Sequence, residues 1–148
     1  MKRIIFALLL LSFAGLSQAH AQIRKIPAAV TDAFKEKYPD AEKVEWHDKL
    51  TAFEARFEIG GIYHEARFNS KGEWQQTEKA IQDDDLPGDV QDGLKKSKYA
   101  EWEIKSIYEI YLPGDEKKYR LYAEKSDLKK KNLLFNSDGR LLKEKITL

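Results

Sequence analysis

Two short stretches of the chain carry apolar residues at the spacing of an α-helix. These residues recur every four positions: Ile26, Val30, Phe34 and Tyr38 in the first stretch, and Leu86, Val90 and Leu94 in the second. Such a spacing places the apolar side chains along one stripe of a helix. Pro27 and Pro87 each follow the first apolar residue, where a helix needs no N–H group. The pattern predicts two short amphipathic helices, of which the second is weakened by Gly88 and Gly93 and depends on packing.

After each predicted helix, apolar and charged residues alternate with a period of two, as in half-buried β-strands. Phe53, Ala55 and Phe57, for example, are separated by single charged residues. The pattern predicts four strands after each helix, at 44–47, 53–58, 62–68 and 74–80 in the first half and near 100–112, 118–126, 129–136 and 140–147 in the second.

The segment FNSKGEW at 68–74 returns as FNSDGRL at 135–141. In each copy we expect the phenylalanine to face the core, the Asn-Ser pair to start a turn and the glycine to supply a positive φ. The residue before the glycine changes from Lys71 to Asp138, which favours a repeated turn over a repeated ligand site. The two copies lie 67 residues apart, whereas the starts of the predicted helices lie 60 residues apart. The second copy therefore contains seven extra residues, which we expect in the hairpin around Pro113.

The repeated pattern indicates an internal duplication. We predict an α+β fold of two tandem α-β-β-β-β units, at 22–82 and 83–148. Joined edge to edge, the units would form one antiparallel sheet with both helices on one face. The other face would then be open to solvent or to a partner.

The first residues have the pattern of a secretory signal peptide. Lys2 and Arg3 precede an apolar run, and Ala19-His20-Ala21 fits a cleavage site, so we predict a signal peptide at 1–21. The apolar run is shorter than the roughly 20 residues of a membrane span, so we expect no membrane insertion after cleavage. The predicted location is the periplasm or the medium.

The composition narrows the classes of function. The full chain has a net charge of +1, and loss of Lys2 and Arg3 leaves 24 basic against 25 acidic residues, a net charge of −1. This balance gives no reason to expect nucleic acid as a partner. The sequence has no cysteine, which excludes disulfides, thiol nucleophiles and thiolate metal sites.

The helix start at Ile26-Pro27, the stop at Tyr38-Pro39, the paired strands and the two FNS turns together resemble the PepSY-like family, also described as beta-lactamase-inhibitor-protein-like. The resemblance covers residues 26–148. It implies an exported protein of two helix-plus-four-strand units that binds a protein or inhibits a secreted enzyme. The secreted inhibitors that gave the fold its name use disulfides, whereas this chain has none.

Candidate catalytic and metal-binding residues are few. We expect His64, in phase with the apolar positions of its strand, to lie on the core face, and His47 to meet solvent. Asp83, Asp84 and Asp85 lack the alternation and the glycine of a calcium loop, so they are expected to form a linker between the units, with calcium binding as the alternative. The sequence shows no catalytic motif, and we expect no cofactor.

Other charged and aromatic residues have structural interpretations. The carboxylate pairs Glu54/Glu58 and Glu101/Glu103 are expected on solvated strand faces, and the run 129–131 of three lysines on a solvated edge strand. The tryptophans are in phase with apolar strand positions and are expected in the core: Trp46, Trp74 and Trp102.

The helix-free face of the predicted sheet is the candidate binding surface. From the strand phases it carries Arg56, Tyr63, Arg67, Ile107, Tyr111, Arg120, Tyr122 and Leu134. A β-bulge in strand 100–112 would reverse the facing of Ile107 and Tyr111. Because tyrosine and arginine carry much of the binding energy at protein interfaces, we predict a non-enzymatic module that holds a protein or peptide partner, as a protein or peptidase inhibitor does. A small-ligand or calcium sensor of the cell envelope is the alternative.

Overall fold

The computed structural model describes residues 25–147, and the predicted signal peptide at 1–21 lies outside the described residues. The first unit consists of α1 (Ala28–Lys37), β1 (Glu42–Lys49), β2 (Ala52–Ile59), β3 (Ile62–Phe68) and β4 (Trp74–Ile81). The second consists of the short 3-10 helix η1 (Asp83–Asp85), α2 (Gly88–Lys95), β5 (Glu103–Tyr111), β6 (Lys117–Ser126), β7 (Lys129–Asn136) and β8 (Leu141–Ile146). The two helices and eight strands predicted from the sequence are confirmed.

All eight strands form one antiparallel sheet, in the order β1 to β8. The pairing of β4 with β5 joins the two repeats, from Thr77 opposite Tyr111 to Ile81 opposite Ile107. The predicted α+β fold, with a repeated α-β4 arrangement and a shared sheet, is therefore confirmed.

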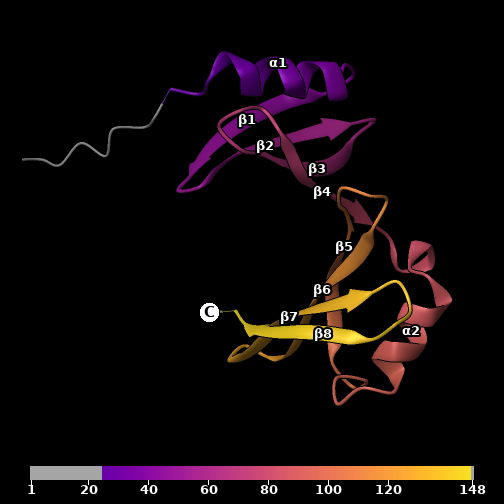
Figure 1. Ribbon diagram of the computed structural model, residues 1–148. Coiled ribbons are helices and arrows are strands. Elements are labelled where there is room, and N and C mark those ends of the chain that lie inside the picture. The colour runs from indigo at the N-terminus through magenta and orange to yellow at the C-terminus, as the bar shows by residue number, and fades with distance from the viewer. Residues whose placement is uncertain (1–24, 148) are drawn as a thin grey trace, which may run out of the picture.

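Both helices cover the same face of this sheet. α1 buries Val30 and Phe34 against the aromatic side chains of β2 and β3, and α2 buries Val90 against β6 and β7. The sheet turns between the two repeats, with both helices on the outer side, so the helix-free face lies on the inner side of the bend (Figure 1). Two hydrophobic clusters result, one under each helix. The tryptophans, expected in the core, are only partly buried and pack at the margins of these clusters: Trp46 and Trp74 at the first, Trp102 at the second.

The two FNS segments form the same turn. The side-chain oxygen of Asn69 accepts hydrogen bonds from the backbone N–H groups of Lys71 and Glu73, at 2.9 and 3.0 Å. Asn136 likewise accepts from the backbone N–H of Arg140, at 2.8 Å. The following glycines have the predicted positive φ, 83° at Gly72 and 77° at Gly139. The interpretation as a turn built twice is confirmed.

The predicted facing of Ile107 and Tyr111 is wrong because β5 contains a β-bulge. Ile104 pairs with Ala123 and Ser106 with Tyr122, which leaves Lys105 as the extra residue. Beyond the bulge the alternation is reversed, so Ile107 lies in the hydrophobic cluster under α2 and Tyr111 shares that face. Neither residue belongs to the helix-free face.

The predicted edge position of the lysine run is also wrong. Lys129–Lys131 begins β7, which pairs with β6 on one side and β8 on the other, so the edges of the sheet are β1 and β8. Lys131 is part of a polar cluster on the helix side of the sheet. Its ammonium group lies 3.0 Å from a carboxylate oxygen of Glu144 and 3.1 Å from the hydroxyl of Tyr99.

This cluster predicts an acid-sensitive contribution to stability. Hydrogen bonds from Tyr99, Lys98 and Lys131 lower the pKa of Glu144 from 4.5 to about 2. Because the folded-state pKa is below the unfolded one, the stabilisation is present above pH 4.5 and is lost as the pH falls towards 2. We expect Glu144→Gln to flatten the decrease in melting temperature across this range. The matched control is Glu101→Gln at an exposed position, and an equally steep decrease in both variants would contradict the prediction.

Candidate functional site

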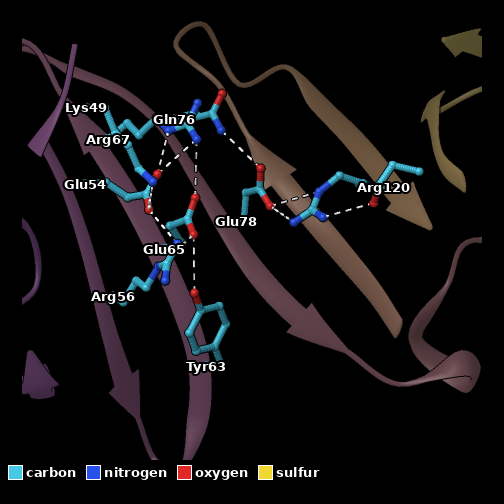
Figure 2. Close-up of polar contacts among 10 residues, drawn as sticks. Lys49, Glu54, Arg56, Tyr63, Glu65, Arg67, Gln76, Glu78 and Arg120 are labelled. Carbon is cyan, nitrogen blue, oxygen red and sulfur yellow. Dashed lines mark hydrogen bonds and ion pairs between the residues drawn. The ribbon is translucent and has the colours of Figure 1, made fainter. Parts of the chain in front are cut away.

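The helix-free face carries a polar network, whose centre is Glu54 on β2. Glu54 is only 1% exposed, although it points away from both helices. Its carboxylate accepts hydrogen bonds from Arg56 at 3.0 Å and from Arg67 at 3.0 and 3.1 Å, and Lys49 lies 3.4 Å away. Figure 2 shows these cations converging on Glu54 from β1, β2 and β3. The expectation that Glu54 lies on a solvated face is therefore wrong, because three cations cover the carboxylate.

Glu65 on β3 extends this centre along the face. It accepts a hydrogen bond from Arg56 at 3.3 Å and one from the hydroxyl of Tyr63 at 3.3 Å, and Arg67 lies 3.6 Å from it. Each arginine therefore contacts two carboxylates, which fixes the planes of both guanidinium groups.

A third carboxylate, the buried Glu78 on β4, lies opposite Glu65 in the strand pairing and extends the polar residues of this face towards the second repeat. It accepts hydrogen bonds from Gln76 at 3.2 Å and from the guanidinium group of Arg120 on β6 (Figure 2). Arg120 also donates to Asn132 on β7 at 3.3 Å and lies over the ring of Tyr108, 4.4 Å from its centroid. The network thus crosses the junction between the two repeats.

The electrostatics of the three carboxylates differ with their surroundings. Burial acts to raise the pKa of Glu54, but hydrogen bonding from Arg67 and the charge of Lys49 outweigh it, so this pKa is lowered. Burial and the neighbouring charges of Glu54 and Glu78 raise the pKa of Glu65. Burial, followed by the charge of Glu65, raises the pKa of Tyr63 to about 12. The Tyr63 hydroxyl therefore remains a hydrogen-bond donor at neutral pH.

Five of the six candidate binding residues share the helix-free face, by the pairing of their strands: Arg56, Tyr63, Arg67, Arg120 and Tyr122. Leu134, opposite Arg120, is also there as predicted. Tyr111 is not, because of the bulge in β5. The same bulge places Tyr108 on the helix-free face, which was not predicted from the sequence. Its ring makes an edge-to-face contact with that of Tyr63, with 6.4 Å between the ring centroids.

A hollow of about 280 Å³ lies on this face between the network and the β8 edge. Ile110 and Leu134 contribute apolar walls, and Arg120, Lys143 and Lys145 contribute positive charge. The pairing of β7 with β8 places Lys143 and Lys145 opposite Leu134 and Asn132, on the same face as the network. The hollow therefore combines apolar surface with an excess of cations.

The histidines and the aspartate cluster lie outside this network or at its margin. His64 is on the helix side as predicted, stacked on Phe57, with Nδ1 hydrogen-bonded to the backbone oxygen of Ile62 at 2.8 Å. His47 does not simply meet solvent: it is half-buried opposite Glu54, and its Nε2 has no hydrogen-bond partner among residues 25–147.

Asp83–Asp85 forms η1, and its exposed carboxylates immediately precede α2. Within the described part of the chain, no three His, Asp or Glu side chains are grouped so as to hold a metal ion. No helix between residues 25 and 147 is long and apolar enough to cross a membrane.

A duplicated α-β4 arrangement with one sheet face free of helices defines the class of beta-lactamase-inhibitor-like folds. The profile of the family described as "Putative beta-lactamase-inhibitor-like, PepSY-like" matches residues 51–143, and the chain belongs to this family. This confirms the resemblance stated from the sequence, and no enzymatic role is indicated. No curated protein is significantly similar to the chain.

Crystal structures of proteins from Bacteroides share the fold. A "BLIP-like protein" from Bacteroides fragilis NCTC 9343 is 26% identical with a TM-score of 0.72, and the match covers 84% of this chain and 89% of the other. A structure from Bacteroides eggerthii DSM 20697 described as "putative periplasmic proteins" is 20% identical with a TM-score of 0.76, and the match covers 82% and 89% of the two chains.

Proposed function

We propose that this protein is an exported, periplasmic binding module that holds a protein partner on its helix-free face, as an inhibitor or a sequestering protein does. The family and its beta-lactamase-inhibitor-like description support a protein partner rather than a reaction. The predicted signal peptide and the description of the Bacteroides eggerthii structure support the periplasm.

The observation that carries this proposal is the polar network. Binding a partner costs free energy whenever long side chains must be ordered at the interface. Here Arg56, Arg67 and Arg120 are already held by buried carboxylates, and Tyr63 and Tyr108 pack against each other beside them. The face therefore presents the residue types that dominate protein interfaces in a fixed arrangement.

The face also indicates the charge of the partner. The carboxylates of Glu54, Glu65 and Glu78 are covered by arginines, whereas Lys143 and Lys145 have no carboxylate within ion-pair distance in residues 25–147. The accessible charge near the hollow is thus positive. A partner with acidic side chains around an apolar centre would complement this surface.

Partner capture from a periplasmic extract of the source bacterium tests the proposal. The variant Tyr63→Ala/Tyr108→Ala/Tyr122→Ala removes three aromatic contacts from the helix-free face and leaves the buried ion pairs in place. We expect it to reduce the affinity for the captured protein by at least about a hundredfold, because aromatic residues at interface centres contribute about 1 kcal/mol or more each.

The matched control, Lys35→Ala/Lys95→Ala, changes exposed residues on the two helices. It should bind as the unaltered protein does. Equal loss of binding in the control, or full binding by the triple variant with unchanged circular dichroism, would contradict the assignment of this face.

A further inference from the structure

A groove of about 530 Å³ lies on the helix side of the sheet, between the two repeats. α1 packs over β2 and β3 and α2 over β6 and β7, so the region over β4 lies between the two hydrophobic clusters. The groove is bounded by the end of α1, by β3 and β4, and by the turn 112–116 between β5 and β6. It is therefore on the face opposite the polar network.

Fixed aromatic side chains form part of the wall. The indole N–H of Trp74 donates to the hydroxyl of Thr77 at 2.8 Å, and the hydroxyl of Tyr38 is hydrogen-bonded to the same oxygen. Thr77 is only 4% exposed, so this shared contact holds both rings. Tyr111 stands on the other side, with its hydroxyl hydrogen-bonded to Glu109 at 2.5 Å.

Two ammonium groups of the groove have no carboxylate partner. Among residues 25–147, neither Lys37 nor Lys79 has a carboxylate within ion-pair distance. Lys37 lies over Trp74 instead, 4.0 Å from the ring centroid. Glu109 is opposite Lys79 in the strand pairing, but its carboxylate is held by Lys117 at 2.8 Å and by Tyr111. Lys79 and Lys117 thus act on the single carboxylate of Glu109, and the groove carries more positive than negative charge on this side.

The groove also offers hydrogen-bond acceptors. Nδ1 of His64 must carry the hydrogen, because its partner, the backbone oxygen of Ile62, can only accept. Burial and the charge of Lys79 lower the pKa of His64, which keeps Nε2 unprotonated at neutral pH. The acidic residues at the rim are Asp115 and Glu116, and Glu116 is paired with Lys118 at 2.9 Å. An anion would consequently be favoured at the α1 side of the groove, away from this turn.

We propose that the groove binds a small organic carboxylate, with the carboxylate group between Lys37 and Lys79 and the body of the ligand against Tyr38, Trp74 and Tyr111. Hydroxyl or N–H groups on the body would donate to His64. Two kinds of molecule have this chemistry: an acidic sugar, and the C-terminal residue of a peptide. The site is separate from the protein-binding face and does not depend on it.

Titration followed by nuclear magnetic resonance of the indole N–H groups tests this site. The probes are two matched pairs, D-glucuronate with D-glucose and N-acetylphenylalanine with N-acetylphenylalaninamide. We expect the carboxylate of one pair to shift the Trp74 signal and its neutral counterpart not to do so. The responding pair identifies the source of the carboxylate. The signals of Trp46 and Trp102, which lie outside the groove, report whether the fold is intact.

The variant Lys37→Gln/Lys79→Gln should weaken binding of the responding carboxylate at least about tenfold, because it removes both positive charges that would hold the carboxylate group. Lys35→Gln, on the same helix but outside the groove, should bind unchanged. The proposal is overturned if neither carboxylate shifts Trp74, if the neutral compounds shift it equally, or if the double variant binds as tightly as the unaltered protein.

Discussion

Replacing Gly139 with alanine is expected to destabilise the protein by about 3 kcal/mol, through left-handed strain and steric overlap together. The residue has a φ of 77°, which an L-residue with a side chain adopts at a cost. An added Cβ would also lie 1.9 Å from the backbone oxygen of Asp89, at the start of α2. Because the obstructing atom belongs to the backbone, relief would require the turn and the helix to separate.

Gly114 provides a matched control for this prediction. It has a similar φ of 80°, but an added Cβ would meet no atom within 4 Å. Gly114→Ala should therefore cost only the strain of the left-handed conformation, about 1 kcal/mol. Unfolding by urea, with the slope compared between variants, measures both effects. Equal destabilisation would show that the contact between turn and helix contributes nothing.

The glycines of the two repeats explain why the FNS segment is repeated. In the first repeat, a Cβ on Gly72 would lie 2.4 Å from the backbone oxygen of Ala29 in α1. In the second, Gly93 of α2 lies against the backbone of Gly139, where a Cβ would be 1.8 Å from the oxygen. Gly93 has a low intrinsic helix propensity, but because it has no side chain it allows the turn to approach α2 closely. Each turn therefore packs closely against the backbone of a helix.

Periodicity predicted most of the fold because each segment carries its own signal. Alternation identified all eight strands, and the four-residue spacing identified both helices. The bulge at Lys105 could not be located in this way. An extra residue in a strand does not change the types of amino acid present, and it is visible only in the pairing with β6. That one residue decides whether Tyr108 or Tyr111 lies on the candidate binding face.

The polar network escaped prediction for a different reason. A glutamate between apolar residues in a strand normally faces solvent, and nothing in the local sequence separates Glu54 from Glu58. Their environments differ because Glu54 lies where β1 and β3 bring Lys49 and Arg67 against it, whereas Glu58 pairs with Lys43 near the edge. Burial of a charge depends on neighbours that strand pairing brings together, so only the assembled sheet reveals it.

We expect Glu54→Ala to destabilise the protein by about 2 kcal/mol. Removing one partner of a buried ion pair costs about 3 to 5 kcal/mol when the remaining charge stays buried. The estimate is reduced here because Arg56 and Arg67 are 38% and 40% exposed and can regain hydration. The control is Glu58→Ala, on the same strand and face, which removes an exposed pair and should cost less than about 1 kcal/mol.

The same substitution should change the titration of Glu65. The charge of Glu54 is one of the causes that raise the pKa of Glu65, and its removal also frees the guanidinium groups of Arg56 and Arg67 to turn towards Glu65. Carbon-13 resonances of the Glu65 carboxyl should therefore show a lower pKa in Glu54→Ala than in the unaltered protein. The prediction is contradicted if Glu54→Ala is no more destabilising than Glu58→Ala and the pKa of Glu65 does not fall. In that case the carboxylate of Glu54 does not hold Arg56 and Arg67, and the fixed arrangement of these arginines on the binding face has another cause.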